Sequence, residues 1–146
     1  MSITRRFFFL VPSIGLFISK TARAEWLNNL FASRSVEASL VESFKTNDIS
    51  LSDKINLKIP TIAENGAVVP LTVTSSLENV EQVYIFVEKN PIPLVALFNL
   101  SPTMEALVSA RVKMAKTSNV IVIIKAQSTL YRTQKKVKVT IGGCGG

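Results

Sequence analysis

The chain has 146 residues, of which 47% are hydrophobic, and this favours one domain with a buried core over a disordered segment. It contains 17 basic residues, 10 acidic residues and no histidine, so it lacks the commonest general base and the commonest metal ligand. One cysteine is too few for a thiolate metal site or an internal disulfide. Aromatic residues make up only 8% and do not alternate with basic ones, which argues against nucleic-acid binding.

The first 24 residues have the pattern of an export signal. Arg5 and Arg6 precede an apolar run over 7–18, which is too short to span a bilayer. The tripeptide Ala-Arg-Ala at 22–24 then has the small-x-small pattern of a signal-peptidase site. The arginine pair followed by Phe and Leu favours the twin-arginine pathway over an ordinary secretory signal. We therefore expect a cleaved signal over 1–24, a periplasmic protein, and no membrane anchor after cleavage.

Charge is unevenly distributed over the rest of the chain. From Glu25 to Glu105 there are ten acidic and five basic residues, a net charge of −5. From Ala106 to Gly146 there are eight basic residues and no acidic one. This basic end suits an anionic small substrate or an acidic docking partner, whereas each lysine taken alone is typical of a solvated strand face.

Residues 25–53 are expected to form a helix and a linker. Apolar residues recur at three- and four-residue spacing over about 25–47, which predicts an amphipathic helix. The polar segment Ser33–Ser35 is expected to interrupt this helix, and Ser35 is suited to cap its second part. The stretch 47–53 is polar and is expected to be a linker.

Residues 54–141 are expected to form the folded domain. Seven mostly apolar or alternating runs predict strands: Ile55–Ile59, Val68–Thr74, Val80–Glu88, Leu94–Leu100, Val108–Met114, Asn119–Ala126 and Lys136–Ile141. Pro70 favours an edge position or a bulge for the second run. The run 119–126 is almost continuously apolar, which is typical of a central strand covered on both faces. With Asn65-Gly66 as a tight turn, the pattern predicts a mainly β fold, an antiparallel β-sandwich of immunoglobulin-like type with an N-terminal helix.

The sequence offers little catalytic chemistry. Glu78, Glu81 and Glu88 lie close in sequence, but they bracket a predicted strand and a turn, where solvated carboxylates are expected. No glycine-rich loop follows a strand and opens a helix, so the C-terminal glycines are not a nucleotide-binding motif. We therefore expect that the protein is not an enzyme and that it uses no cofactor.

The only cysteine, Cys144, lies between two pairs of glycines at the end of the sequence. These flanking residues are Gly142, Gly143, Gly145 and Gly146. Because glycine packs nothing and reaches backbone regions closed to other residues, we expect 142–146 to be a flexible arm. The three residues after Ile141 reach roughly 10 Å. A lone thiol in an oxidising compartment is a reactive group or an intermolecular link, so this arm is suited to enter the active site of another protein.

The chain from about Ile55 onward resembles SoxY, the sulfur-carrier subunit of the periplasmic sulfur-oxidising Sox system. The matching stretches are Ile59–Gly66, Val69–Val73, Phe86–Pro93 and Val137–Gly146. The terminal pentapeptide combined with an arginine-pair export signal is the most specific part of this resemblance. The region 25–53 is the least diagnostic part.

The resemblance implies an immunoglobulin-like sandwich in a heterodimer with a SoxZ-like subunit, which the twin-arginine route would export as a folded passenger. It implies that a c-type cytochrome of the SoxAX type joins thiosulfate oxidatively to the thiol of Cys144. A hydrolase of the SoxB type would then release sulfate, and a sulfane dehydrogenase of the SoxCD type, where present, would oxidise the remaining sulfur. The protein would be a covalent carrier whose arm moves between these enzymes.

Two further interpretations belong to other functional classes. An exported structural or adhesive sandwich would dimerise through a disulfide of Cys144. A ubiquitin-like sulfur carrier would instead use the carboxyl group of Gly146 as a thiocarboxylate. The export signal and the sandwich pattern speak against the second interpretation, because the adenylation that this chemistry needs is cytosolic.

Overall fold

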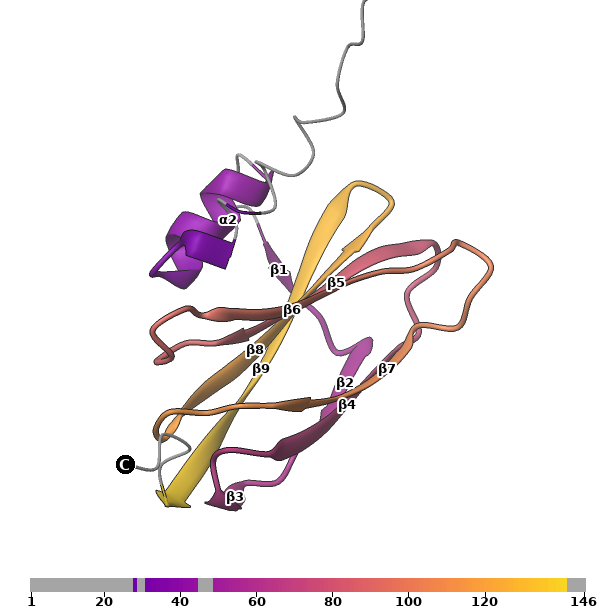
Figure 1. The fold of residues 1–146 in the computed structure, drawn as a ribbon. Coiled ribbons are helices and arrows are strands. Elements are labelled where there is room, and N and C mark those ends of the chain that lie inside the picture. The colour runs from indigo at the N-terminus through magenta and orange to yellow at the C-terminus, as the bar shows by residue number, and fades with distance from the viewer. Residues whose placement is uncertain (1–27, 29–30, 45–48, 142–146) are drawn as a thin grey trace, which may run out of the picture.

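Two β-sheets face each other in the computed structural model, and one short helix lies against the larger sheet (Figure 1). The structure describes residue 28 and the segments 31–44 and 49–141. The expected signal at 1–24 lies outside the described residues.

Helix α2 spans Val36–Phe44 and begins where a serine can cap it. The Oγ atom of Ser35 accepts a hydrogen bond from the backbone N–H of Ala38 at 3.0 Å, which confirms the predicted cap. The interruption predicted at Ser33–Ser35 is also confirmed, because helical backbone before it, at residues 28, 31 and 32, does not continue through it. The cap at Ser35 stabilises the start of helix α2. This helix, Val36–Phe44, is therefore shorter than the helix over about 25–47 that the apolar spacing predicts.

The larger sheet has six strands in the order β1-β9-β8-β5-β6, with β3 also paired to β9. Its strands are β1 (Ser50–Leu51), β3 (Ile62–Asn65), β5 (Val80–Val87), β6 (Leu94–Asn99), β8 (Ser118–Ala126) and β9 (Thr129–Ile141). The smaller sheet has the order β2-β4-β7. Its strands are β2 (Ile55–Lys58), β4 (Val69–Ser75) and β7 (Leu107–Val112). The mainly β sandwich with one short N-terminal helix is therefore confirmed.

Two strand pairs depart from the predicted antiparallel pattern. Strands β1 and β3 both pair with β9 in the parallel direction. Strand β1 also lies within the segment 47–53, which was predicted to be a linker throughout. These short strands extend the larger sheet by pairing their backbone along β9, and neither has the length or the alternation that marks a strand in a sequence.

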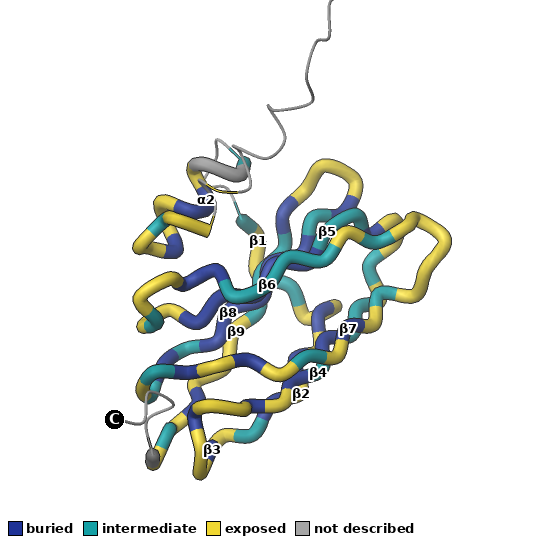
Figure 2. Tube along the Cα trace, viewed as in Figure 1, coloured by how far each residue is buried: buried dark blue, intermediate teal, exposed yellow. Residues whose placement is uncertain are grey.

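Strand β8 lies at the centre of the larger sheet, as its apolar run predicts, because it pairs with both β5 and β9. Val120, Val122 and Ile124 belong to the core between the two sheets. Ile121 and Ile123 belong to a second core that includes Val36 and Leu40 of helix α2. The buried residues concentrate in β5 and β8 (Figure 2). The helix therefore covers the face of the larger sheet that the smaller sheet leaves open.

Pro70 lies in β4, which is the central strand of the smaller sheet and not an edge strand. Strand β2 ends at Lys58, opposite Thr72, so at Pro70 the strand has a neighbour on one side only, as at an edge position. Pro70 lies beyond this point and pairs only with Arg111 of β7. Because β2 does not reach Pro70, the missing N–H of proline costs no hydrogen bond to that strand.

Tyr84 fixes helix α2 on the sheet. Its ring meets the ring of Phe44 edge to face, with the centroids 4.9 Å apart. Its hydroxyl donates a hydrogen bond to Oε1 of Gln82 at 2.9 Å. Burial raises the pKa of Tyr84 to about 12, so the hydroxyl keeps the proton that it donates.

Candidate functional site

Strand β9 carries the chain to Ile141, the last described residue before the cysteine. Over Thr129–Val137 it pairs with β8, and from Lys138 to Ile141 it pairs with β3. Figure 1 shows β3 and the end of β9 at the same end of the molecule. The predicted arm, with Cys144 and its four glycines, lies outside the described residues. The described part of the site is therefore the root of the arm, the segment 138–141.

Thr117 clamps the root to the turn between β7 and β8. Its Oγ1 accepts a hydrogen bond from the N–H of Val139 at 3.0 Å and donates one to the carbonyl of Val139 at 3.4 Å. On the other side, the hydroxyl of Thr140 donates to the carbonyl of Glu64 at 3.1 Å. The N–H of Lys138 donates to the carbonyl of Thr61 at 2.8 Å. The root is thus held by two different segments of the fold.

Asn90 ties the turn between β5 and β6 to the same end of the sandwich. Its Nδ2 donates to the carbonyl of Lys113 at 2.7 Å, and its Oδ1 accepts from the N–H of Ala115 at 2.9 Å. Close by, Oγ of Ser118 accepts from the N–H of Lys89 at 2.9 Å. Two turns that are distant in sequence, the turn between β5 and β6 and the turn between β7 and β8, are therefore linked beside the root.

No motif in the sequence marks Thr117 or Asn90 as a residue of the site. The tight turn predicted at Asn65-Gly66 is confirmed, since the N–H of Ala67 bonds to Oδ1 of Asn65 at 2.8 Å. Asn90 stands before a proline, which signals a turn, but nothing in the sequence shows that its amide reaches Lys113 and Ala115 in the turn after strand β7. The role of Thr117 depends on long-range pairing and leaves no local signal.

We expect replacement of Thr117 by valine to loosen the root of the arm. The variant keeps the shape of the side chain but leaves the N–H of Val139 without its partner, which costs about 1–2 kcal/mol when the group is shielded from water. The free energy of unfolding should fall by this amount, and hydrogen exchange at Val139 should become faster. Thr140→Val is the matched control, because the carbonyl of Glu64 belongs to an exposed residue that water can reach. Equal effects of both substitutions would contradict the clamp.

The carboxylates of Glu78, Glu81 and Glu88, which lie close in sequence, do not form an acid–base pair. Glu81 forms an ion pair with Lys125 at 2.7 Å near the start of β5. Glu88 lies beyond the other end of β5, where its Oε2 accepts a hydrogen bond from Asn119 at 2.9 Å. Among the described residues, no group of three or more histidine, cysteine, aspartate or glutamate side chains could hold a metal ion. In the same part of the chain, no helix has the length and apolar content needed to cross a membrane.

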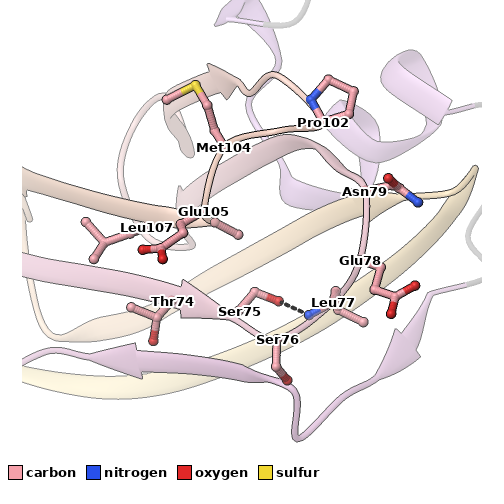
Figure 3. A pocket seen from close by; sticks show the side chains of 11 residues that line it. Thr74, Ser75, Ser76, Leu77, Glu78, Asn79, Pro102, Met104, Glu105 and Leu107 are labelled. Atoms are coloured by element: carbon pink, nitrogen blue, oxygen red, sulfur yellow. Dashed lines mark hydrogen bonds between the residues drawn. The ribbon is translucent and has the colours of Figure 1, made fainter.

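A hollow of about 560 Å³ opens between the segments 74–79 and 102–107, at the opposite end of β4 from the turn at 65–68. Figure 3 shows the carboxylates of Glu78 and Glu105 on different sides of this hollow. The hydrogen bond drawn there joins the N–H of Leu77 to Oγ of Ser75 at 3.1 Å and closes a turn. The hollow thus brings no pair of reactive groups together, and it is remote from the root of the arm.

Comparisons with solved structures find other chains with a similar fold. A superoxide reductase (neelaredoxin) from Ignicoccus hospitalis is 16% identical, with a TM-score of 0.52, over 62% of this chain and 94% of that chain. At this identity the likeness concerns the fold alone. No curated protein matches the chain.

Two further findings concern the family. The sulfur carrier protein SoxY from Chlorobium limicola f thiosulfatophilum has a structure similar to this one, with a TM-score of 0.67 and 41% sequence identity. The match covers 73% of this chain and 97% of that chain. The family model described as sulfur oxidation protein SoxY matches residues 41–144. The chain belongs to the SoxY family of sulfur oxidation proteins.

Proposed function

We propose that the protein is a covalent carrier that holds thiosulfate-derived sulfur on Cys144 and presents it to the enzymes of sulfur oxidation. One observation carries this proposal: the only cysteine of the chain follows, after two glycines, a strand whose end is held from two sides. Membership in the SoxY family and the carrier of this family from Chlorobium support the same function. The protein then acts as a bound substrate of other enzymes and not as a catalyst.

In the proposed chemistry, the thiol of Cys144 is the only group of this protein that reacts. A thiolate is the nucleophilic form of cysteine, and joining its sulfur to thiosulfate removes two electrons. A c-type cytochrome of the SoxAX type accepts these electrons, and the product is a cysteine S-thiosulfonate. A hydrolase of the SoxB type then adds water across the terminal sulfur–sulfur bond, releases sulfate and leaves a persulfide on Cys144. A sulfane dehydrogenase of the SoxCD type, where present, oxidises the persulfide sulfur.

The proposal extends to location and architecture. Residues 1–24 act as a twin-arginine signal and the mature protein works in the periplasm, which the arginine pair and the cleavage pattern support. The domain over 54–141 is an immunoglobulin-like sandwich that forms a heterodimer with a SoxZ-like subunit, and its two facing sheets support this fold type. The glycines at 142, 143, 145 and 146 make the arm narrow and flexible.

Mass spectrometry tests the proposed function. The heterodimer is incubated with thiosulfate and the partner enzymes, and the tryptic peptide 139–146 is then measured. We expect a thiosulfonate on Cys144 after the cytochrome step and a persulfide after the hydrolase step, both removed by a reductant. Thiosulfate consumption without any adduct on this peptide would contradict the carrier. Disulfide-linked dimers through Cys144 as the only product would favour the structural alternative.

A further inference from the structure

Exposed lysines lie on the strand ends and turns at the same end of the sandwich as the root of the arm. We call them the basic root patch, and they are Lys89, Lys113, Lys116, Lys136 and Lys138. Glu64 and Glu88 are the nearby carboxylates, and Oε2 of Glu88 accepts a hydrogen bond from Asn119. Over the described residues, the single ion pair joins Lys125 to Glu81, at the far end of strands β5 and β8. Within this part of the protein, the lysines of the patch therefore form no ion pair.

The backbone beneath the patch is tied together by hydrogen bonds. Lys138 precedes Val139 and Lys116 precedes Thr117, and this valine and threonine are joined by the clamp. Lys136 lies opposite Asn119 in the ladder between β8 and β9. The N–H of Lys89 and the carbonyl of Lys113 are each bonded to a side chain of another turn, Ser118 and Asn90. Five positive charges thus lie on segments that hydrogen bonds connect, and none of the five forms an ion pair with a carboxylate of the described residues.

The opposite end of the sandwich has the opposite character. Asp53, Glu78 and Glu105 are exposed there, and the same end carries Lys54 and the ion pair of Lys125. A protein with charge separated in this way is oriented by the field of a charged partner before contact. The end that approaches an acidic surface is the end that carries the arm.

We propose that the basic root patch docks on acidic surfaces around the active-site entrances of the enzymes that receive the arm. The proposal rests on the proposed function of Cys144. Because three residues reach at most about 10 Å, an enzyme that takes the thiol into a pocket must approach the root of the arm and meet the residues around it. Exposed charges act over about 8 Å at physiological ionic strength, so the patch and an acidic rim attract each other at this distance.

Salt-dependent kinetics of the heterodimer test the docking patch. The variant Lys116→Gln/Lys136→Gln/Lys138→Gln is compared with the wild type as the varied substrate of the purified hydrolase and cytochrome. We expect kcat/KM to fall roughly tenfold at low ionic strength with kcat unchanged, and the difference to vanish at high salt. Lys54→Gln, at the acidic end, is the matched control and should change neither constant. If the substitutions on β9 weaken folding, the single variant Lys116→Gln, which lies in a turn, is used instead. We expect a smaller fall in kcat/KM for this variant.

Two outcomes would overturn the docking patch. One is an unchanged kcat/KM for the triple variant, or a fall as large for Lys54→Gln. The other is a fall in kcat/KM of the triple variant that is matched by slower labelling of Cys144 with a small anionic disulfide, while labelling with neutral iodoacetamide stays unchanged. The lysines would then attract small anions and not a protein surface. Either result can occur with normal adducts on Cys144, whereas absence of adducts in the wild type contradicts the proposed function itself.

Discussion

Replacement of Cys144 by serine is expected to abolish sulfur loading and turnover completely while leaving the fold intact. A serine hydroxyl is not ionised near neutral pH and forms no bond to sulfur, whereas a thiol with a pKa of about 8.5 supplies a reactive thiolate. Because glycines flank this position and the arm is expected to pack against nothing, we expect the two cores of the sandwich to be unaffected. The measurements are thiosulfate-dependent cytochrome reduction by the reconstituted enzymes and the mass of the peptide 139–146.

The control for this variant is its thermal unfolding, which should match that of the wild type. Full turnover by Cys144→Ser would contradict the carrier on this residue. Since the variant leaves the carboxyl group of Gly146 free, such a result would favour a thiocarboxylate at that position. Loss of turnover together with loss of folding would show that Cys144 contributes to the sandwich, which also contradicts the proposed arm.

Replacement of Ile123 by alanine is expected to give a large loss of stability. Its side chain is fully buried, in the centre of the larger sheet, in the core that includes Val36 and Leu40 of helix α2. Removing a buried isoleucine down to alanine costs about 2–5 kcal/mol, because apolar burial is lost and a cavity remains. We expect a value of about 3–4 kcal/mol at this central position, measured as the free energy of unfolding in urea.

Leu51→Ala provides the matched control on the same sheet. Leu51 lies on the short strand β1 and is 81% exposed, so its truncation should change the free energy of unfolding by less than about 0.5 kcal/mol. The difference between the two variants isolates the contribution of the core beneath the helix. Similar losses for both would contradict the two-core arrangement of the larger sheet.

Local patterns in the sequence predict the parts of the fold that local physics determines. The apolar run at 119–126 predicts a strand covered on both faces, and the structure confirms it with β8 between two cores. The cap at Ser35 follows from the hydrogen-bonding ability of a serine before an apolar periodic segment. Strand β3 was missed because its four residues bury only Ala63, which leaves no alternation to detect.

The candidate site also has one part that the sequence predicts and another part that only the fold reveals. Cys144 is predicted from its place between two pairs of glycines and from the family resemblance, and its role stays a prediction because the residue lies outside the described part of the chain. The excess of lysines near the C-terminus was also visible in the sequence, but their grouping depends on topology. Lys125 and Arg132 belong to the same basic segment, yet the pairing of β8 with β9 places them away from Lys136 and Lys138. Only the fold brings Lys89 to the same end.

Strand β9 takes up any force that is applied to the C-terminal end of the chain. If the proposed carrier function holds, an enzyme that releases the C-terminus slowly while the carrier diffuses away would pull on Ile141 along the axis of this strand. The hydrogen bonds of the antiparallel ladder to β8 over Thr129–Val137 lie across that axis, so they resist in shear and share the tension. Beyond them, the parallel pairing with β3 adds bonds that are slanted to the axis. A hairpin at a sheet edge would instead peel open one bond at a time. A pull on the end of β9 therefore loads its pairing with both β8 and β3.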